Sequence, residues 1–177
     1  MQTFKSITIG NFTIPEFAIG RGELIQLVLP EINLGDYPLQ LKQVLSQSTT
    51  FKLVDAEEVV QKNLLGFSHS IVKVLTRSQV QLGTRWQEYL HKEQISLHTR
   101  VSALPYGVRY ILALEIALVK CDYLIIDLSG NDYKTLSQIK KILVEETTKG
   151  KSFLVLKENN SLLTDFNLGK ELLVIEN

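Results

Sequence analysis

The sequence predicts an α/β fold whose central sheet is mostly parallel. Three observations within residues 105–158 lead to this class: an apolar helical segment, a buried strand that ends at an aspartate, and an amphipathic helix followed by another strand. A strand, a helix and a second strand with short connections form a βαβ unit, in which the two strands are parallel. We therefore expect a sheet built around this unit.

The first helix of this stretch spans residues 106–119 and carries only Arg109 and Glu115 as charged side chains. A helix without a polar stripe is buried, and Pro105 suits its first turn. The strand at 123–127 follows. Apolar residues then recur at helical spacing over 134–149, Gly150 marks the helix end, and 152–156 predicts the second strand.

The N-terminal part of the chain predicts short strands before a buried one. Residues 7–9 and 12–14 flank a turn at Gly10, glycines 20 and 22 mark another turn, and 24–29 reads as a buried strand that Pro30 ends. A helix is expected to include 39–45. Further along, the pattern is weaker: strands are predicted at 51–54 and 71–75, helices at 57–65 and 84–93, and a last strand at 171–175.

Length and composition define the class of protein. The 177 residues fit one domain over 1–177, 45% are hydrophobic, and 19 basic residues balance 19 acidic ones. Nothing here favours nucleic acid, an anionic membrane surface or insertion into a membrane, so we expect a cytoplasmic protein. The lone Cys121 excludes an intrachain disulfide, and the scattered histidines 69, 91 and 98 argue against a metal site.

Asp127 is the first candidate functional residue. It stands where the apolar run 124–126 ends, and ligand crevices of open α/β sheets lie beyond the carboxyl ends of the strands. The simpler interpretation of one such aspartate is that it opens the turn or caps the next helix.

A phosphate-binding loop needs backbone N–H groups freed by glycines, a lysine and a hydroxyl. The segment 31–36, after the strand at 24–29, has one glycine, no lysine and two carboxylates. The tripeptide Gly-Lys-Ser at 150–152 ends a helix and begins a strand, which is the reverse of the required order, so it predicts a turn.

In order along the chain, these features resemble the ATP-binding subunits of ABC transporters. Gly22 and Glu23 match the pair before the phosphate-loop strand, 104–118 is similar to the signature motif with its helix, 123–127 is similar to the Walker B strand, and 129–132 is similar to the loop at the dimer contact. The likeness covers most of the chain, which is shorter than a complete subunit. It implies a three-layer P-loop-NTPase-like fold with a reduced helical subdomain, inserted at about 76–104.

The departures from the family are as informative as the match. Gly35 stands where the resemblance expects the phosphate-loop lysine, Leu128 replaces the glutamate that positions water, and Glu158 stands at the switch histidine. A leucine cannot accept a proton, and lost cations remove phosphate contacts. The resemblance therefore implies a degenerate ABC-like protein with no catalytic residues and no cofactor, which acts as an interaction, assembly or regulatory subunit.

The implied partners are a second copy of the chain, an intact ABC ATPase subunit, or a membrane permease that would hold it at the inner membrane face. The contact face implied by the family comprises Leu104, Pro105, Tyr106, Gly107, Ser129, Gly130, Asn131 and Asp132. Equally, these residues can be a helix start and a turn left from ancestry.

Two alternatives remain open. In the first, Asp127 still holds Mg²⁺ with ATP and residual nucleotide binding survives. In the second, the chain is an unrelated α/β scaffold or ligand-binding domain. A sheet in which strand 24–29 does not lie beside strand 123–127 would favour the second alternative.

Overall fold

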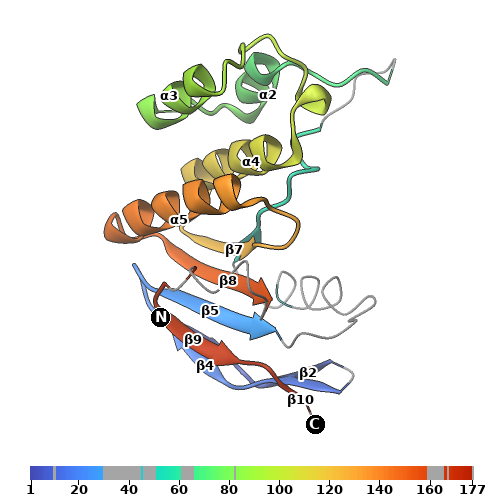
Figure 1. Cartoon of the computed structure of the whole chain (residues 1–177). Helices are drawn as coiled ribbons and strands as arrows, with labels where there is room; N and C mark the ends of the chain where they lie inside the picture. Colours follow the sequence, from blue (N-terminus) through green and yellow to red (C-terminus); the bar gives the residue numbers. More distant parts are fainter. Residues whose placement is uncertain are drawn as a thin grey trace. The chain divides into compact units, whose positions relative to one another are not determined.

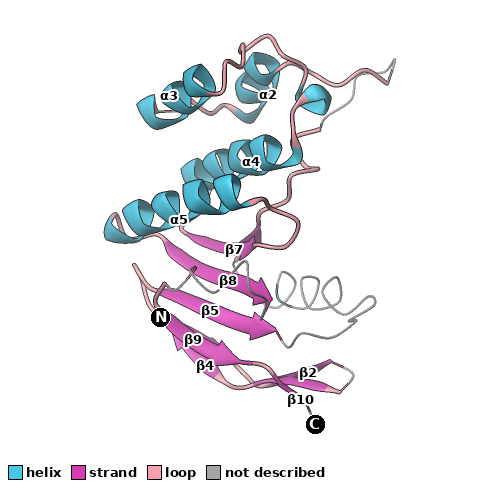
Figure 2. Cartoon of the chain, viewed as in Figure 1, coloured by secondary structure: helices cyan, strands magenta, loops and turns pink. Residues whose placement is uncertain are grey.

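The computed structural model describes residues 1–9, 11–29, 45, 51–60, 66–81, 83–158, 166 and 168–176. The chain groups into two compact units (Figures 1 and 2). We call Met1–Leu53 together with Cys121–Asn177 the sheet unit, and Val54–Lys120 the helical unit. Residues 76–104, where the resemblance implies an insertion, fall within the range of the helical unit.

The sheet unit is built on a parallel sheet. Among the described residues, its strand order is β6-β7-β8-β5-β9, and every neighbouring pair is parallel. The predicted α/β class is confirmed, as are the buried strand at 24–29 and the two strands of the βαβ unit. The strands are β5 (Leu24–Leu29), β6 (Lys52–Leu53), β7 (Tyr123–Asp127), β8 (Ser152–Glu158) and β9 (Lys170–Leu173).

The two strands expected to be neighbours are separated by one strand. Leu156 of β8 is the register partner of both Leu27 in β5 and Asp127 in β7, so β8 lies between them. The short crossover of the βαβ unit places β8 directly beside β7, and β5 then pairs with the other edge of β8. The expectation that β5 and β7 are adjacent was wrong.

Short antiparallel strands complete the sheet unit. β1 (Gln2–Phe4) pairs with β4 (Phe17–Ile19), and β3 (Phe12–Ile14) lies between β2 (Ile7–Ile9) and β10 (Ile175–Glu176). The single strand predicted at 171–175 was wrong, because the chain divides there between β9 and β10, which belong to different sheets. A core cluster joins these strands to one face of the parallel sheet and includes Phe4, Ile14, Ile19, Ile25, Leu27, Ile125 and Leu154.

Helix α5 (Tyr133–Thr148) connects β7 to β8, and the turn after it explains the Gly-Lys-Ser tripeptide. Gly150 takes a positive φ of 92°. Lys151 forms an ion pair with Asp122 at 2.8 Å, which lowers the pKa of that carboxyl. The buried Ser152 hydroxyl donates to Gly20 O and accepts from Gly22 N. The tripeptide is a structural turn, as predicted.

The helical unit contains α2 (Ile71–Ser78), α3 (Thr84–Lys92), the 3-10 turn η1 (Val101–Ala103) and α4 (Tyr106–Lys120). Helices α3 and α4 confirm their predictions, and ten residues of α4 are buried, as its apolar sequence requires. The strand predicted at 71–75 was wrong: this segment is the start of α2, where Ile71 and Val74 are buried at helical spacing. Residues 56–59 form a turn, and 61–65 of the predicted helix lie outside the described residues.

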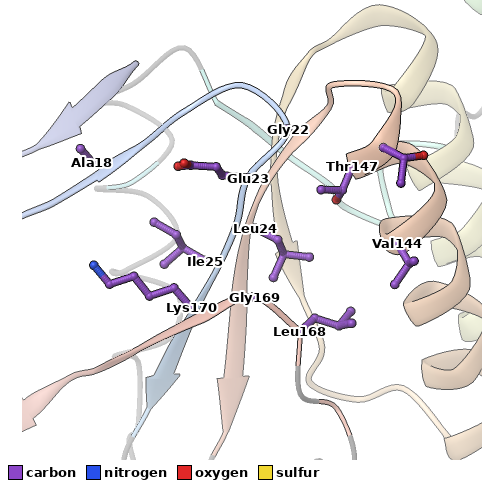
Figure 3. Close-up of a pocket in the computed structure, with 11 residues that line it drawn as sticks. Ala18, Gly22, Glu23, Leu24, Ile25, Val144, Thr147, Leu168, Gly169 and Lys170 are labelled. Atoms are coloured by element: carbon purple, nitrogen blue, oxygen red, sulfur yellow. The ribbon is translucent and has the colours of Figure 1, made fainter.

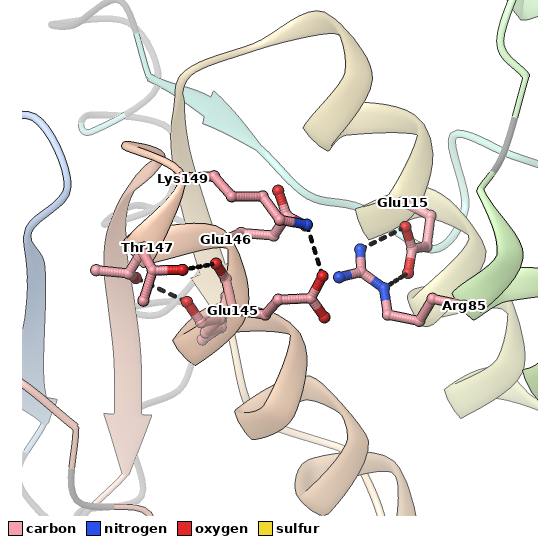
Figure 4. Close-up of polar contacts among 8 residues, drawn as sticks. Arg85, Glu115, Glu145, Glu146, Thr147 and Lys149 are labelled. Atoms are coloured by element: carbon pink, nitrogen blue, oxygen red, sulfur yellow. Dashed lines mark hydrogen bonds and ion pairs between the residues drawn. The ribbon is translucent and has the colours of Figure 1, made fainter.

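Polar groups also organise the helical unit. Arg85 of α3 makes two 2.8 Å hydrogen bonds to the buried carboxylate of Glu115 in α4 (Figure 4). His69 is buried and its Nε2 has no hydrogen-bond partner; burial, with Arg77 and Lys73 nearby, lowers its pKa. Over the described ranges, no helix is both long and apolar enough to span a membrane.

Candidate functional site at the carboxyl edge of the sheet

The candidate site is the loop between β7 and α5, which begins at Asp127. The Asp127 side chain is half-buried, and its Oδ1 accepts hydrogen bonds from Ser129 N at 3.0 Å and from Ser129 Oγ at 2.7 Å. This arrangement is an Asx-turn, in which an aspartate closes the turn that follows it. Asp127 therefore holds the turn after β7, as in the simpler interpretation of its sequence position. The same carboxylate lies at the edge of the sheet where ligands of α/β proteins bind.

Leu128, the next residue, is an apolar side chain with 1% exposure. Its backbone N–H donates to Leu156 O at 3.1 Å, which continues the pairing of β7 with β8 beyond Asp127. Because the backbone is fixed in the sheet and the side chain points into the core, Leu128 offers no group that could accept a proton or hold water.

The rest of the loop is shaped by backbone geometry and one helix cap. Gly130 has a positive φ of 73°, and Asn131 Nδ2 donates to Leu128 O and Ser129 O at 3.4 and 3.3 Å. Asp132 caps α5 by accepting a hydrogen bond from Thr135 N at 2.7 Å, and hydrogen bonding with Thr135 lowers the pKa of the Asp132 carboxyl. The Gly130 and Asp132 side of the loop is exposed.

Tyr133 is a surface residue that the sequence interpretation missed. It begins α5 directly after the loop and is 70% exposed. Tyr133 precedes the buried Leu136 by three residues, a spacing that places both on one apolar stripe of a helix. Periodicity alone therefore predicts that Tyr133 is buried. An exposed tyrosine beside a polar loop is a residue type enriched at protein interfaces.

The other half of the predicted contact face, at 104–107, belongs to the helical unit. Leu104 is buried at 6% exposure, whereas Pro105 and Tyr106 are exposed. Arg109 lies over the Tyr106 ring at 5.9 Å and pairs with Glu57 at 3.3 Å. The side chains that this segment can present are therefore Pro105 and Tyr106.

The segment predicted to have lost phosphate binding, 31–36, lies outside the described residues, and so does the side chain of Glu158. Within the described ranges, no group of three histidine, cysteine, aspartate or glutamate side chains converges on one point where a metal ion could bind. The described part of the edge thus offers the Asp127 carboxylate and an exposed loop.

Comparison with known proteins gives the class of fold. No family model matches the sequence, and no curated protein matches it significantly. Solved structures do match: the chain has the fold of the ATP-binding subunits of ABC transporters.

Particular structures show how far this likeness extends. CbiO1 from Clostridium perfringens, part of the ABC transporter complex cbiONQ, aligns with 90% of this chain and 78% of its own length at a TM-score of 0.57 and 16% identity. A structure described as a metal-chelate type ABC transporter in an inward-facing conformation aligns with 93% and 74% at a TM-score of 0.63 and 13% identity. Because these structures align with most of the chain, the separation of β5 from β7 is not a sign of an unrelated fold.

Proposed function

We propose that this chain is a degenerate ABC-ATPase-like protein that does not hydrolyse ATP and acts as an interaction, assembly or regulatory subunit. The partner would be a second copy or an intact ABC ATPase subunit. Through a permease, the chain would lie at the cytoplasmic face of a membrane. The fold supports the ABC-like class, and the two transporter structures above suggest the kind of complex.

The observation that carries the proposal is the burial of Leu128. The resemblance places the water-positioning glutamate at this position, one residue after Asp127. Here the side chain is apolar and in the core, and its backbone is bonded to β8. A general base must reach the attacking water through a basic atom, and a buried leucine has none. The acidic composition of 31–36 supports the same conclusion from sequence.

The contact face would use the loop at 129–132 together with Tyr133. Asp127 and Asp132 fix the two ends of this loop by hydrogen bonds to Ser129 and Thr135. A loop held in one conformation loses little entropy on binding. The exposed Tyr133 ring would supply the apolar anchor that the polar loop lacks.

Nucleotide chemistry is tested with the purified chain and an Asp127→Asn variant, which keeps an oxygen for Ser129. We expect no ATP hydrolysis above that of the variant and no change of melting temperature with Mg-ATP. A ligand at a hundred times its dissociation constant stabilises by about 2.7 kcal/mol, which such a scan detects. Hydrolysis that Asp127→Asn abolishes contradicts the proposal. Stabilisation without hydrolysis supports the alternative of residual nucleotide binding.

The interaction role is tested by affinity isolation from the native host. We expect an ABC ATPase subunit or a permease to copurify with the wild-type chain, and sedimentation to show whether the chain also associates with itself. Tyr133→Ala should lose the partner, whereas Leu173→Ala, which alters a similarly exposed apolar residue on β9, should retain it. Recovery of neither partner, with no self-association, removes the support for a subunit role.

A further inference from the structure

A pocket of about 600 Å³ lies at the amino edge of the parallel sheet, where β5 and β9 begin. Its lining belongs entirely to the sheet unit and includes the last turns of α5. The β5 backbone separates the lining side chains into two groups (Figure 3). Glu23 and Lys170 lie on one side, whereas Leu24, Val144, Thr147 and Leu168 lie between β5 and α5. We call the part lined by these last four residues the helix side of the pocket.

The strand register explains why the two groups are separate. Successive residues of a strand point to opposite faces of the sheet. Leu24 faces the helix side, and the next residue, Ile25, is a member of the core cluster on the other face. Lys170 is the register partner of Ile25, so its side chain leaves β9 toward that other face. A molecule on the helix side therefore has neither the Lys170 ammonium nor the Glu23 carboxylate beside it.

The polar groups of the helix side already have hydrogen-bond partners. The Thr147 hydroxyl donates to Leu143 O at 2.7 Å, and the Thr147 carbonyl accepts from Gly150 N at 3.0 Å. The carbonyl of Leu168 accepts a hydrogen bond from the buried Gln26 side chain. The remaining lining on this side consists of apolar side chains, so the removal of apolar surface from water is the main contribution that a bound molecule can gain.

Close backbone packing fixes the chain that carries the apolar side chains of the helix side. Gly169 has a positive φ of 69°, and a Cβ there would lie 2.1 Å from Leu24 O, so only glycine lets β9 begin this close to β5. Gly22 N donates to the Ser152 hydroxyl at 3.1 Å, which ties the start of β5 to β8. The backbone at Leu24 and Leu168 is therefore held in place without a ligand, as in binding sites that are largely pre-formed.

Val144 leaves apolar surface uncovered in this site. Leu24 is 8% exposed, but Val144 is 48% exposed. A molecule that lies between these two side chains removes the Val144 surface from water. The volume of the whole pocket falls in the range of small-molecule sites, about 300–1,000 Å³. Because the helix side is only part of the pocket, the molecule that fits there is small, such as a single aromatic ring.

We propose that the helix side of this pocket binds small neutral apolar molecules, held between Leu24, Val144 and Leu168. A charged molecule is disfavoured there, because it would lose its hydration without meeting an opposite charge. The site lies at the amino edge of the sheet, whereas the proposed contact face lies at the carboxyl edge. It therefore stands independently of the proposed function.

The test uses toluene, benzoate and benzylammonium, which share one aromatic ring and differ in charge, with the full chain labelled for NMR. We expect toluene to shift the amides of residues 22–25, 144–148 and 168–170 in a saturable manner. Benzoate and benzylammonium should bind at least about tenfold more weakly, because each would place an unpaired charge against apolar side chains. No saturable shift with toluene, shifts centred elsewhere in the chain, or equal binding of either charged molecule would overturn the proposal.

Three variants separate the two sides of the pocket. Val144→Ser removes apolar surface from the helix side and should weaken toluene binding about fourfold, the equivalent of one buried methylene group. Val119→Ser, the same substitution at a 56% exposed position of α4, is the matched control and should bind toluene as the wild type does. Lys170→Ala removes the charge across β5 and should also leave toluene binding unchanged. Unchanged binding by Val144→Ser, or an equal loss with Lys170→Ala, contradicts the proposal.

Discussion

Replacing Arg85 by alanine tests how far the helical unit depends on one buried ion pair. The two guanidinium–carboxylate hydrogen bonds are both 2.8 Å long, and the Glu115 side chain is 8% exposed while Arg85 is 25% exposed. Removal of one partner of a buried pair costs about 3–5 kcal/mol because the other charge stays buried and unpaired. Since part of Arg85 is exposed and water can replace it, we expect a loss of about 2–3 kcal/mol.

The assay is urea unfolding followed by fluorescence and circular dichroism. Trp86, the single tryptophan of the chain, lies next to Arg85 in α3 and is 1% exposed, so its emission reports on the helical unit. With a slope of about 2 kcal/mol per molar urea, the expected loss lowers the midpoint by roughly 1–1.5 M. Circular dichroism shows whether the sheet unit unfolds in the same transition.

Two further variants separate charge from packing. Arg85→Lys keeps the charge but cannot make the two-pronged contact, so we expect an intermediate loss of about 1–2 kcal/mol. The double variant Arg85→Met with Glu115→Leu removes both charges and should return to within about 1 kcal/mol of the wild type. The reasoning is refuted if the free energy of unfolding of Arg85→Ala lies within about 0.5 kcal/mol of the wild-type value, or if the double variant is as unstable as Arg85→Ala.

Three other predictions concern a helix cap, a buried histidine and a close backbone contact. Asp132→Ala should lower the free energy of unfolding by about 1 kcal/mol near neutral pH. Because the Asp132 pKa is lowered, this difference from the wild type should keep its whole size above about pH 3.9 and vanish as the pH falls through the lower folded pKa. A difference that stays constant in acid would contradict this prediction. His69 has a lowered pKa, so the free energy of unfolding should be highest above about pH 6.5 and fall as the pH drops toward the folded pKa. Melting temperatures of His69→Leu over the same pH range should not show this fall. The same fall in both proteins would exclude His69 as its cause. The Cβ of Gly169→Ala would collide with Leu24 O, whereas Gly66, which also has a positive φ, has open space around it. Urea unfolding should therefore show that Gly169→Ala loses at least about 1 kcal/mol more stability than Gly66→Ala. Equal losses would show that the contact relaxes.

Much of the sheet unit was predictable because its strands are locally unambiguous. Apolar runs bounded by turn residues gave β5, β7 and β8, and the stripe through Leu136 and Ile139 gave α5. The middle of the chain was less predictable. Residues 71–75 are rich in β-branched side chains, which favour a strand, yet burial of Ile71 and Val74 on one helical face decided for α2. Propensity is a weak preference that packing overrides.

The candidate site divides in the same way. Sequence located Asp127 and the polar residues 129–132, because a sharp change from apolar to turn-forming residues is visible in one dimension. It could not show that Asp127 bonds to Ser129, that Leu128 is sealed in the core, or that Tyr133 is exposed. These facts depend on which atoms meet across the end of a sheet.

By itself, the sequence determined the fold class, the βαβ unit and the position of the acidic residue at the end of β7. These follow from the local alternation of apolar and polar residues, which fixes the element type and its buried face. Only the tertiary structure decided that β8 lies between β5 and β7, that the chain after 169 divides between two sheets, and that Gly169 closes against Leu24 to bound a pocket. Strand order and close backbone approach are set by contacts between residues far apart in the chain, and no local pattern encodes them.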